Sequence, residues 1–180
     1  MSRILLGVTG SIAAYKAAEL VRLYASAGHE VKVVMTKAAT EFVSPLTFRT
    51  LSRNPVGVEE FAPPEDWRPE HIALAAWAEK AVIAPATANT IAKMRFGLAD
   101  NLLTSVLLAT RAPVFVAPAM NDGMWENAAT QENLAALKSR GVTVIEPGEG
   151  QLACGTCGRG RMATPEEICG KTLQGGKGTK

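Results

Sequence analysis

The chain has 180 residues, a net charge of +2 and 47% hydrophobic residues, so it can bury a core without disulfides or metal ions. Scattered Lys and Arg residues argue against nucleic-acid binding, and no apolar run is long enough to span a bilayer. An odd number of cysteines, three, argues against a secreted, disulfide-built scaffold. We therefore expect a cytoplasmic protein that contacts neither nucleic acid nor membrane.

Short runs of β-branched and aromatic residues alternate with helix-period segments. Strands are expected at residues 4–8, 31–35, 81–84, 114–117 and 142–145. Helices are expected at residues 12–23, 72–80, 100–110 and 127–139, with Gly28 and Gly141 placed to end the first and the last. This alternation predicts an α/β fold, a single-domain doubly wound parallel sheet of flavodoxin-like or Rossmann-like type with helices on both faces.

Two segments do not follow this pattern. Residues 53–69 contain several prolines and mixed charge, which indicates an irregular connection with at most a short edge strand. Residues 147–161 are rich in glycine and contain two cysteines, which predicts a long functional loop. We expect the folded domain to cover residues 1–170 and a flexible tail to cover residues 171–180.

The segment Gly7-Val8-Thr9-Gly10-Ser11-Ile12 links the first expected strand to the first expected helix. Backbone N–H groups of residues 10–12 would meet there at the positive end of a helix dipole, which suits one phosphate. The three spaced glycines of a dinucleotide site and the Lys-Ser/Thr of a triphosphate loop are missing, so a mononucleotide is favoured. Close packing of the turn explains the glycines equally well.

Small polar residues follow two further expected strands. Thr36 comes after the second strand, and Thr87 and Thr90 come after the third. The carboxyl ends of parallel strands share one edge of the sheet, so Thr36 could bind the same phosphate and a flat ring could lie close to the backbone. Capping of a helix N-terminus is the alternative role for Thr36.

The segment Pro118-Ala119-Met120-Asn121-Asp122-Gly123-Met124-Trp125 follows the fourth expected strand. It places Asn121 with two methionines and a tryptophan where open α/β sheets hold ligands. The alternative is a tight turn in which Met124 and Trp125 fill the core.

His71 precedes a helical run, and a helix start disfavours its cationic form, so a neutral imidazole could accept a proton there. An exposed surface histidine is the alternative. Cys154 and Cys157 form a Cys-x-x-Cys pair that suits a redox pair or half of a zinc site. The surrounding glycines favour a single reactive cysteine carried on a mobile flap, and no metal site is expected.

Taken together, four motifs resemble those of the homo-oligomeric flavin-containing cysteine decarboxylases. They run in order along nearly the whole chain: Gly10-Ser11-Ile12-Ala13-Ala14-Tyr15-Lys16, Pro85-Ala86-Thr87-Ala88-Asn89-Thr90, Pro118-Ala119-Met120-Asn121-Asp122-Gly123-Met124-Trp125, and Ala153-Cys154-Gly155 with Gly158, Gly160 and Arg161. Cys157 departs from the family pattern, and a disulfide with Cys154 would silence the enzyme under oxidation.

The resemblance implies an FMN cofactor and a set of site residues. The residues implied for FMN are Gly10, Ser11, Ile12, Thr36, Thr87, Ala88, Asn89, Thr90 and Ala119. The catalytic residues implied are His71 as base, Asn121 as carboxylate ligand and Cys154 as proton donor. The residues implied beside the substrate are Asn121, Met124, Gln151, Leu152 and Ala153. A trimer or a tetramer of trimers is also implied, in which His71 serves a neighbour's flavin.

The activity implied is FMN-dependent decarboxylation of phosphopantothenoylcysteine to phosphopantetheine in coenzyme A biosynthesis. Oxidation of the thiol to a thioaldehyde supplies an electron sink for the loss of CO₂, and the enethiolate is then reduced again. The alternatives are a peptidyl-cysteine decarboxylase, a prenyl-transferring flavin enzyme and a non-catalytic flavin-binding regulatory subunit. A fused or separate phosphopantothenoylcysteine synthetase is a further expected partner.

Overall fold

A central parallel sheet organises the molecule. The structure is a computed structural model that describes residues 1–61, 68–151, 155 and 157–174. Six strands pair in parallel in the order β3-β2-β1-β4-β5-β6. Their bounds are β1 (Arg3–Val8), β2 (Glu30–Met35), β3 (Val56–Gly57), β4 (Lys80–Ala86), β5 (Val114–Pro118) and β6 (Thr143–Val144). This is the Rossmann strand order, and it confirms the predicted fold class.

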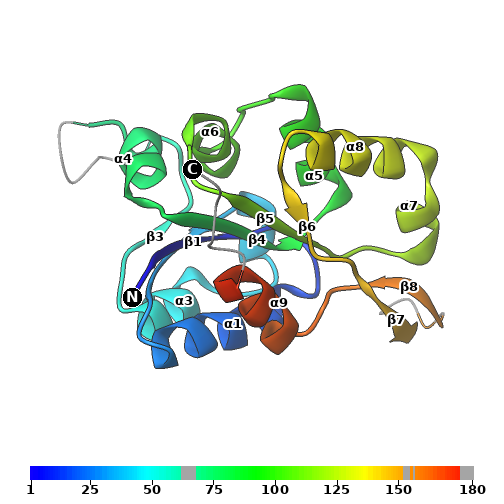
Figure 1. The fold of residues 1–180 in the computed structure, drawn as a ribbon. Helices are drawn as coiled ribbons and strands as arrows, with labels where there is room; N and C mark the ends of the chain where they lie inside the picture. The colour runs from blue at the N-terminus through cyan, green and yellow to red at the C-terminus, as the bar shows by residue number, and fades with distance from the viewer. Residues whose placement is uncertain (62–67, 152–154, 156, 175–180) are drawn as a thin grey trace.

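Helices cover both faces of the sheet (Figure 1). One face carries α1 (Ala14–Ser26), α3 (Pro45–Ser52) and α9 (Pro165–Gln174). The other carries α4 (Glu70–Trp77), α5 (Ala88–Phe96), α6 (Leu102–Ala109) and α8 (Ala128–Ser139). Two short helices, α2 (Lys37–Thr40) and α7 (Asp122–Glu126), directly follow β2 and β5.

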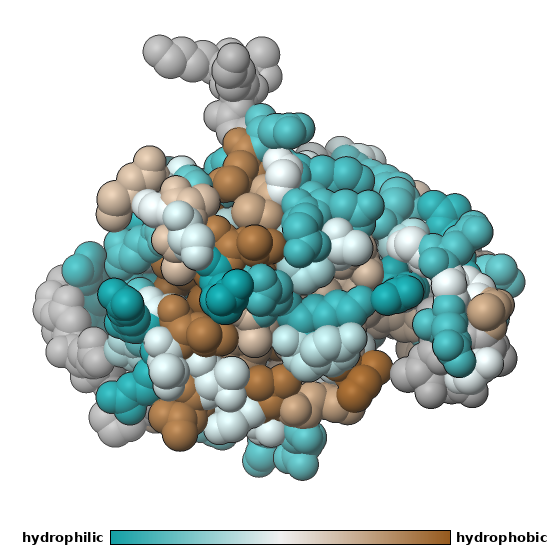
Figure 2. Space-filling view, turned by 90° about the horizontal axis from the view of Figure 1, so that it is seen from below, coloured by the Kyte–Doolittle hydropathy of each residue, from teal (hydrophilic) through white to brown (hydrophobic). Residues whose placement is uncertain are grey.

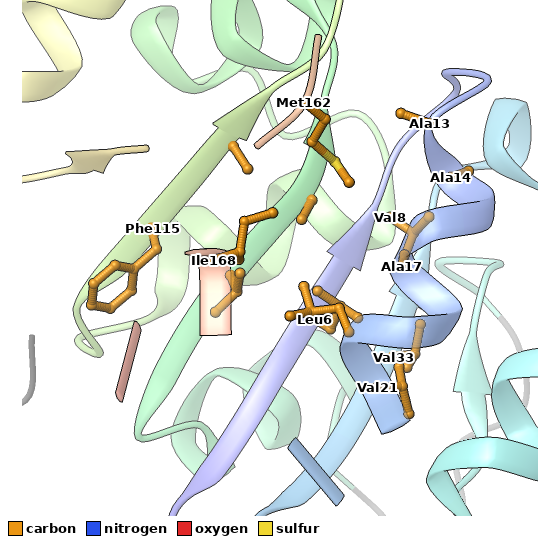
Figure 3. Packing of buried hydrophobic residues seen from close by; sticks show 14 of the residues in the cluster. Leu6, Val8, Ala13, Ala14, Ala17, Val21, Val33, Phe115, Met162 and Ile168 are labelled. Atoms are coloured by element: carbon orange, nitrogen blue, oxygen red, sulfur yellow. The ribbon is translucent and has the colours of Figure 1, made fainter. Parts of the chain in front are cut away.

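The first strand shows why the sheet is covered twice. Ile4, Leu6 and Val8 are fully buried in the cluster under α1 and α9, whereas Leu5 packs in the cluster under α4 and α6. Side chains of successive strand residues point to opposite faces, so an uninterrupted apolar run needs a helical layer on each side. Figure 3 shows Leu6 and Val8 packed against Ala17 and Val21 of α1.

The predicted second helix is too long by three residues at its end. It was expected to reach Lys80, but α4 ends at Trp77, Ala78 is extended and Lys80 begins β4. The Lys80 side chain is buried, and its Nζ donates to the Thr172 carbonyl of α9 at 2.7 Å. That bond links the start of β4 to the last turn of α9.

The predicted tail also begins too early. Helix α9 continues to Gln174, because Thr172 is fully buried and Leu173 packs against the core cluster. The expected helix ends at Gly28 and Gly141 are confirmed, since both have positive φ, 80° and 86°. The expected edge strand within residues 53–69 is β3.

The prediction of a long loop at residues 147–161 is wrong for the residues that the structure describes. Residues Gly148–Gln151 (β7) and Cys157–Arg161 (β8) pair as an antiparallel ribbon. Gly150 and Gly160 have φ of 149° and 142°, which L side chains rarely adopt. The glycines therefore shape an extended ribbon rather than a loop.

Thr9 joins the two strands at the centre of the sheet. Its hydroxyl donates to the Pro85 carbonyl at 2.7 Å and accepts from the Thr87 backbone N–H at 3.0 Å, and the side chain is buried. Pro85 lies near the end of β4 and Thr87 directly follows it. This one hydroxyl therefore holds the end of β4 against the segment that follows β1.

We expect Thr9→Val to lower the free energy of unfolding by roughly 1–3 kcal/mol, because a buried carbonyl and N–H lose their partner. Urea denaturation measures the change. Thr130→Val is the matched control, since Thr130 is also buried and its hydroxyl makes no hydrogen bond within the described residues. Equal losses in both variants would contradict this role.

Candidate active site

The strand order places a crevice at the carboxyl end of the sheet. Connections from β1 and β4 leave toward opposite faces, and ligands of such sheets bind between them. The structure has a cleft of about 590 Å³ beside this point. Its walls are residues 11–13, 15 and 16 at the start of α1, residues 119–121 after β5, and Gln151 with residues 160–162 of the β7–β8 ribbon.

The ribbon forms one wall of this cleft and stands off the body of the molecule. Figure 2 shows the molecule hollowed beside the lobe at its right, where Figure 1 places β7 and β8. The Met120 backbone N–H donates to the Gly160 carbonyl at 3.0 Å. Arg159, which lies beside Gly160 on β8, pairs with Glu146 at 3.2 Å, and its guanidinium lies over the Trp125 ring. These contacts dock the ribbon against the segment that follows β5.

Five of the residues expected at the site line the cleft: Ser11, Ile12, Ala119, Asn121 and Gln151. Ser11 and Ile12 lie in a turn before α1 rather than in its first turn, because α1 begins at Ala14. The Ser11 N–H donates to the Thr9 carbonyl at 2.8 Å. It therefore does not point toward a ligand, although the sequence analysis expected the N–H groups of residues 10–12 to do so. Within the described part of the chain, the Ile12 N–H donates to no protein acceptor.

Gly10 and Thr36 lie together beside the cleft. A Cβ on Gly10 would come within 2.6 Å of the Ala38 Cβ, so the glycine allows α2 to approach. Thr36 occupies the N-cap position of α2, but its hydroxyl makes no cap hydrogen bond. That hydroxyl is buried without a partner among the described residues. A buried orphan hydroxyl costs free energy unless a ligand satisfies it.

The loop after β4 is held largely by its own hydrogen bonds. The Thr87 hydroxyl caps α5 by accepting from the Thr90 N–H at 3.3 Å, and it also donates to the Thr90 hydroxyl at 3.2 Å. Thr90 is buried, Ala88 is half-buried and Asn89 is exposed. None of these four residues lines the cleft. They lie after the strand that Thr9 ties to β1.

Asn121 is the N-cap residue of α7 and lines the cleft. Its side-chain oxygen accepts from the Gly123 N–H at 2.9 Å, so the amide is fixed as an N-cap. Met124, expected beside the substrate, is 49% exposed and does not line the cleft. Trp125 is buried in the core, so the core-filling alternative holds for Trp125 and is wrong for Met124.

His71 lies in the first turn of α4, as the helix-start prediction requires. It is half-buried and does not line the cleft. Helix α4 and the β7–β8 ribbon lie at opposite sides of the molecule in Figure 1. One copy of the chain therefore does not bring His71 to its own Asn121.

Two cationic residues of the cleft, Lys16 and Arg161, were missed as site residues by the sequence analysis. Lys16 lies in the first turn of α1, and both residues were quoted only as parts of motifs. Burial, and secondarily the nearby charge of Arg161, lower the pKa of Lys16 below its usual value.

The expected residues Leu152, Ala153 and Cys154 lie outside the described residues. Cys157 is an exposed free thiol on β8. Among the residues that the structure describes, no group of three His, Cys, Asp or Glu side chains is arranged to hold a metal ion. No helix in the described ranges is long and apolar enough to cross a membrane.

Comparison with known proteins decides the family. The flavoprotein family model matches residues 1–175. The chain belongs to the flavoprotein family. Coenzyme A biosynthesis bifunctional protein CoaBC of Haemophilus influenzae is 49% identical over 165 residues, which cover 92% of this chain and 41% of that protein. This flavoprotein chain thus spans less than half the length of that curated relative.

Solved structures match over almost the whole flavoprotein chain. A cysteine-to-serine mutant of PPC decarboxylase, complexed with pantothenoylaminoethenethiol, has a TM-score of 0.87 and 35% identity, covering 98% of this chain and 99% of that one. The FMN-dependent cysteine decarboxylase SpaF has a TM-score of 0.85 and 30% identity, covering 99% of this chain and 98% of that one.

We expect Gly160→Ala to release the ribbon from the segment that follows β5. Gly160 has positive φ, and a Cβ there would collide with the Met120 carbonyl oxygen. Strain of this kind should speed hydrogen exchange at the Met120 amide roughly tenfold to a hundredfold. Gly148→Ala on the same ribbon is the control, because nothing lies within 4 Å of its Cβ position. Unchanged exchange in Gly160→Ala would contradict the docking role.

Proposed function

We propose that this chain catalyses the FMN-dependent decarboxylation of phosphopantothenoylcysteine to phosphopantetheine in coenzyme A biosynthesis. The observation that carries the proposal is the cleft at the carboxyl end of the sheet, lined by Ser11, Ala119 and Asn121, in a fold similar over its full length to a PPC decarboxylase. We also propose that the complete protein carries a fused synthetase and is cytoplasmic, since its relatives are bifunctional CoaBC proteins.

The residues beside the cleft fit FMN. The buried Thr36 hydroxyl and the Ile12 N–H are polar groups without a protein partner among the described residues, and Gly10 leaves the turn between them free of a side chain. We assign the phosphate to residues 10–12 with Thr36, and the remainder of the cofactor to residues 87–90 and Ala119. When bound, FMN supplies a two-electron oxidant for the substrate thiol and returns the electrons after CO₂ has left.

The chain's own side chains then orient the substrate and move protons. The Asn121 amide is fixed by its N-cap bond and can donate to the substrate carboxylate without neutralising it. This matters because the carboxylate must stay ionised and weakly held in order to leave as CO₂. Cys154 is assigned as the donor of the proton that completes the saturated thiol, and Gln151, Leu152 and Ala153 lie beside the substrate in this assignment.

We assign the general base to His71 of a neighbouring copy of the chain. His71 lies away from the cleft of its own copy, so a homo-oligomer is required to complete the site. We propose a trimer or a tetramer of trimers. Its formation would bury apolar side chains that are exposed in one copy, among them Ile72 beside His71.

The direct test is turnover by the purified, FMN-loaded protein. We expect a bound flavin spectrum and conversion of phosphopantothenoylcysteine to phosphopantetheine with release of CO₂, followed by mass spectrometry. A protein that cannot be reconstituted with FMN, or one that binds FMN without turnover, would overturn the proposed function. Release of an unsaturated enethiol by the unaltered protein would instead favour the peptidyl-cysteine type of decarboxylase.

For Cys154→Ser we expect flavin to stay bound and CO₂ still to be released, while the product remains the unsaturated enethiol. The hydroxyl of serine is a far weaker acid than a thiol, so the final protonation should fail. Mass spectrometry of the product distinguishes the two outcomes. Cys169→Ser, a half-buried cysteine on α9, is the control. Normal phosphopantetheine formation by Cys154→Ser would exclude the assigned role.

Asn121→Asp separates the structural and chemical roles of this residue. Aspartate keeps the N-cap of α7 but places a negative charge against the substrate carboxylate. We expect normal folding and FMN binding, with kcat/KM lowered about a hundredfold or more. Asn127→Asp makes the same change at the N-cap of α8, where the side chain accepts from the Ala129 N–H at 3.0 Å outside the cleft. Equal effects of the two changes would contradict the assignment.

A further inference from the structure

The cleft contains positive charge that no carboxylate among the described residues balances. Lys16 projects from the start of α1 and Arg161 ends β8, and both line the cleft. None of the lining residues that the structure describes is Asp or Glu. Among the described residues, neither cation forms a salt bridge.

Other cations on the same elements are paired. Arg22 of α1 pairs with Glu19 at 3.1 Å, and Arg159 of β8 pairs with Glu146 at 3.2 Å. The two cleft cations instead repel each other, and partial burial disfavours the charge of Lys16 further. An anion bound between them would relieve both effects.

We propose that Lys16 and Arg161 form the binding subsite for the terminal phosphate monoester of the substrate. A phosphate monoester is a dianion near neutral pH, so it matches two cations in charge. Guanidinium binds two phosphate oxygens in a fixed fork, while the ammonium serves as a point charge for the third. This subsite rests on the proposed function and deepens it, because it selects a phosphorylated cysteine derivative over a peptide.

The cofactor carries a phosphate monoester too, but the geometry favours the substrate. The groups that fit the cofactor phosphate are the Ile12 N–H and the Thr36 hydroxyl, at the turn before α1. Lys16 lies inside α1, which begins only after the turn that contains Ile12. Arg161 belongs to the ribbon that also brings Gln151 to the cleft, on the side assigned to substrate.

The subsite also complements Asn121, which lines the same cleft. The substrate has a carboxylate beside its reacting thiol and a phosphate at its far end. A neutral amide and a pair of cations bind the two anionic groups with different strength. The cations hold the group that stays, and the amide orients the group that leaves.

The test compares two substrates that differ only in the phosphate, phosphopantothenoylcysteine and pantothenoylcysteine. In Lys16→Met and Arg161→Gln we expect KM for the phosphorylated substrate to rise about tenfold to a hundredfold, because a charge-assisted hydrogen bond is lost. KM for the dephosphorylated substrate and the retention of FMN should stay unchanged. Arg22→Gln is the matched control on the same helix as Lys16, because Arg22 pairs with Glu19 and does not line the cleft, and it should change neither KM.

A second measurement does not depend on turnover. Calorimetric titration of the FMN-loaded protein should show phosphopantetheine binding more tightly than pantetheine, and each cleft substitution should remove that difference. Loss of FMN in the variants would assign the pair to the cofactor phosphate and overturn the proposal, as would equal effects on both substrates. If the unaltered protein turns over neither substrate, the proposed function fails, while the titration still decides the subsite.

Discussion

The crevice between β1 and β4 is the constraint on which the rest of the structure depends. Because the chain crosses to one face after β1 and to the other after β4, no helix can cover the carboxyl ends of these two strands. The Thr9 hydroxyl links the two strands next to the crevice, because it donates to the Pro85 carbonyl and accepts from the Thr87 backbone N–H. The turn that precedes α1 and the loop that precedes α5 are thereby held in fixed relation, and every assigned cofactor contact except those of Thr36 and Ala119 lies on these two segments.

The β7–β8 ribbon supplies a wall of the cleft that the sheet alone does not form. A Rossmann-like crevice is open to water, and the β7–β8 ribbon walls one side of it by packing its glycines against the segment after β5. Gly158 leaves room for Asp122, and Gly160 leaves room for the Met120 carbonyl. Glycine therefore acts here by permitting close approach of the Asp122 side chain and the Met120 backbone, and the position of the cleft wall depends on the absence of side chains at Gly158 and Gly160.

The strands and the residues directly after them could be predicted from the sequence, and much of the remainder could not. Apolar runs such as residues 4–8 are buried on both faces, so they give a signal that is independent of tertiary context. Helix α3 was missed although the sequence carries its start signal, an N-cap serine, Ser44, followed by Pro45 in the first turn. The ribbon had no such signal, because paired glycines leave no side-chain alternation. Lys16 and Arg161 were missed because their meeting depends on how the ribbon docks.

The proposed catalytic groups do not all lie at the cleft of a single copy of the chain. The cleft brings together Asn121, the turn before α1 and the ribbon, whereas His71 starts a helix at the opposite side of the molecule. A base assigned to His71 can act only across an interface, and the exposed Ile72 next to it offers apolar surface to bury there. Assembly would then control catalysis without any conformational change, since an isolated copy would keep its cofactor and substrate contacts and lack only the base. Separate measurements of flavin binding and of turnover at decreasing protein concentration would distinguish this arrangement from a self-sufficient monomer.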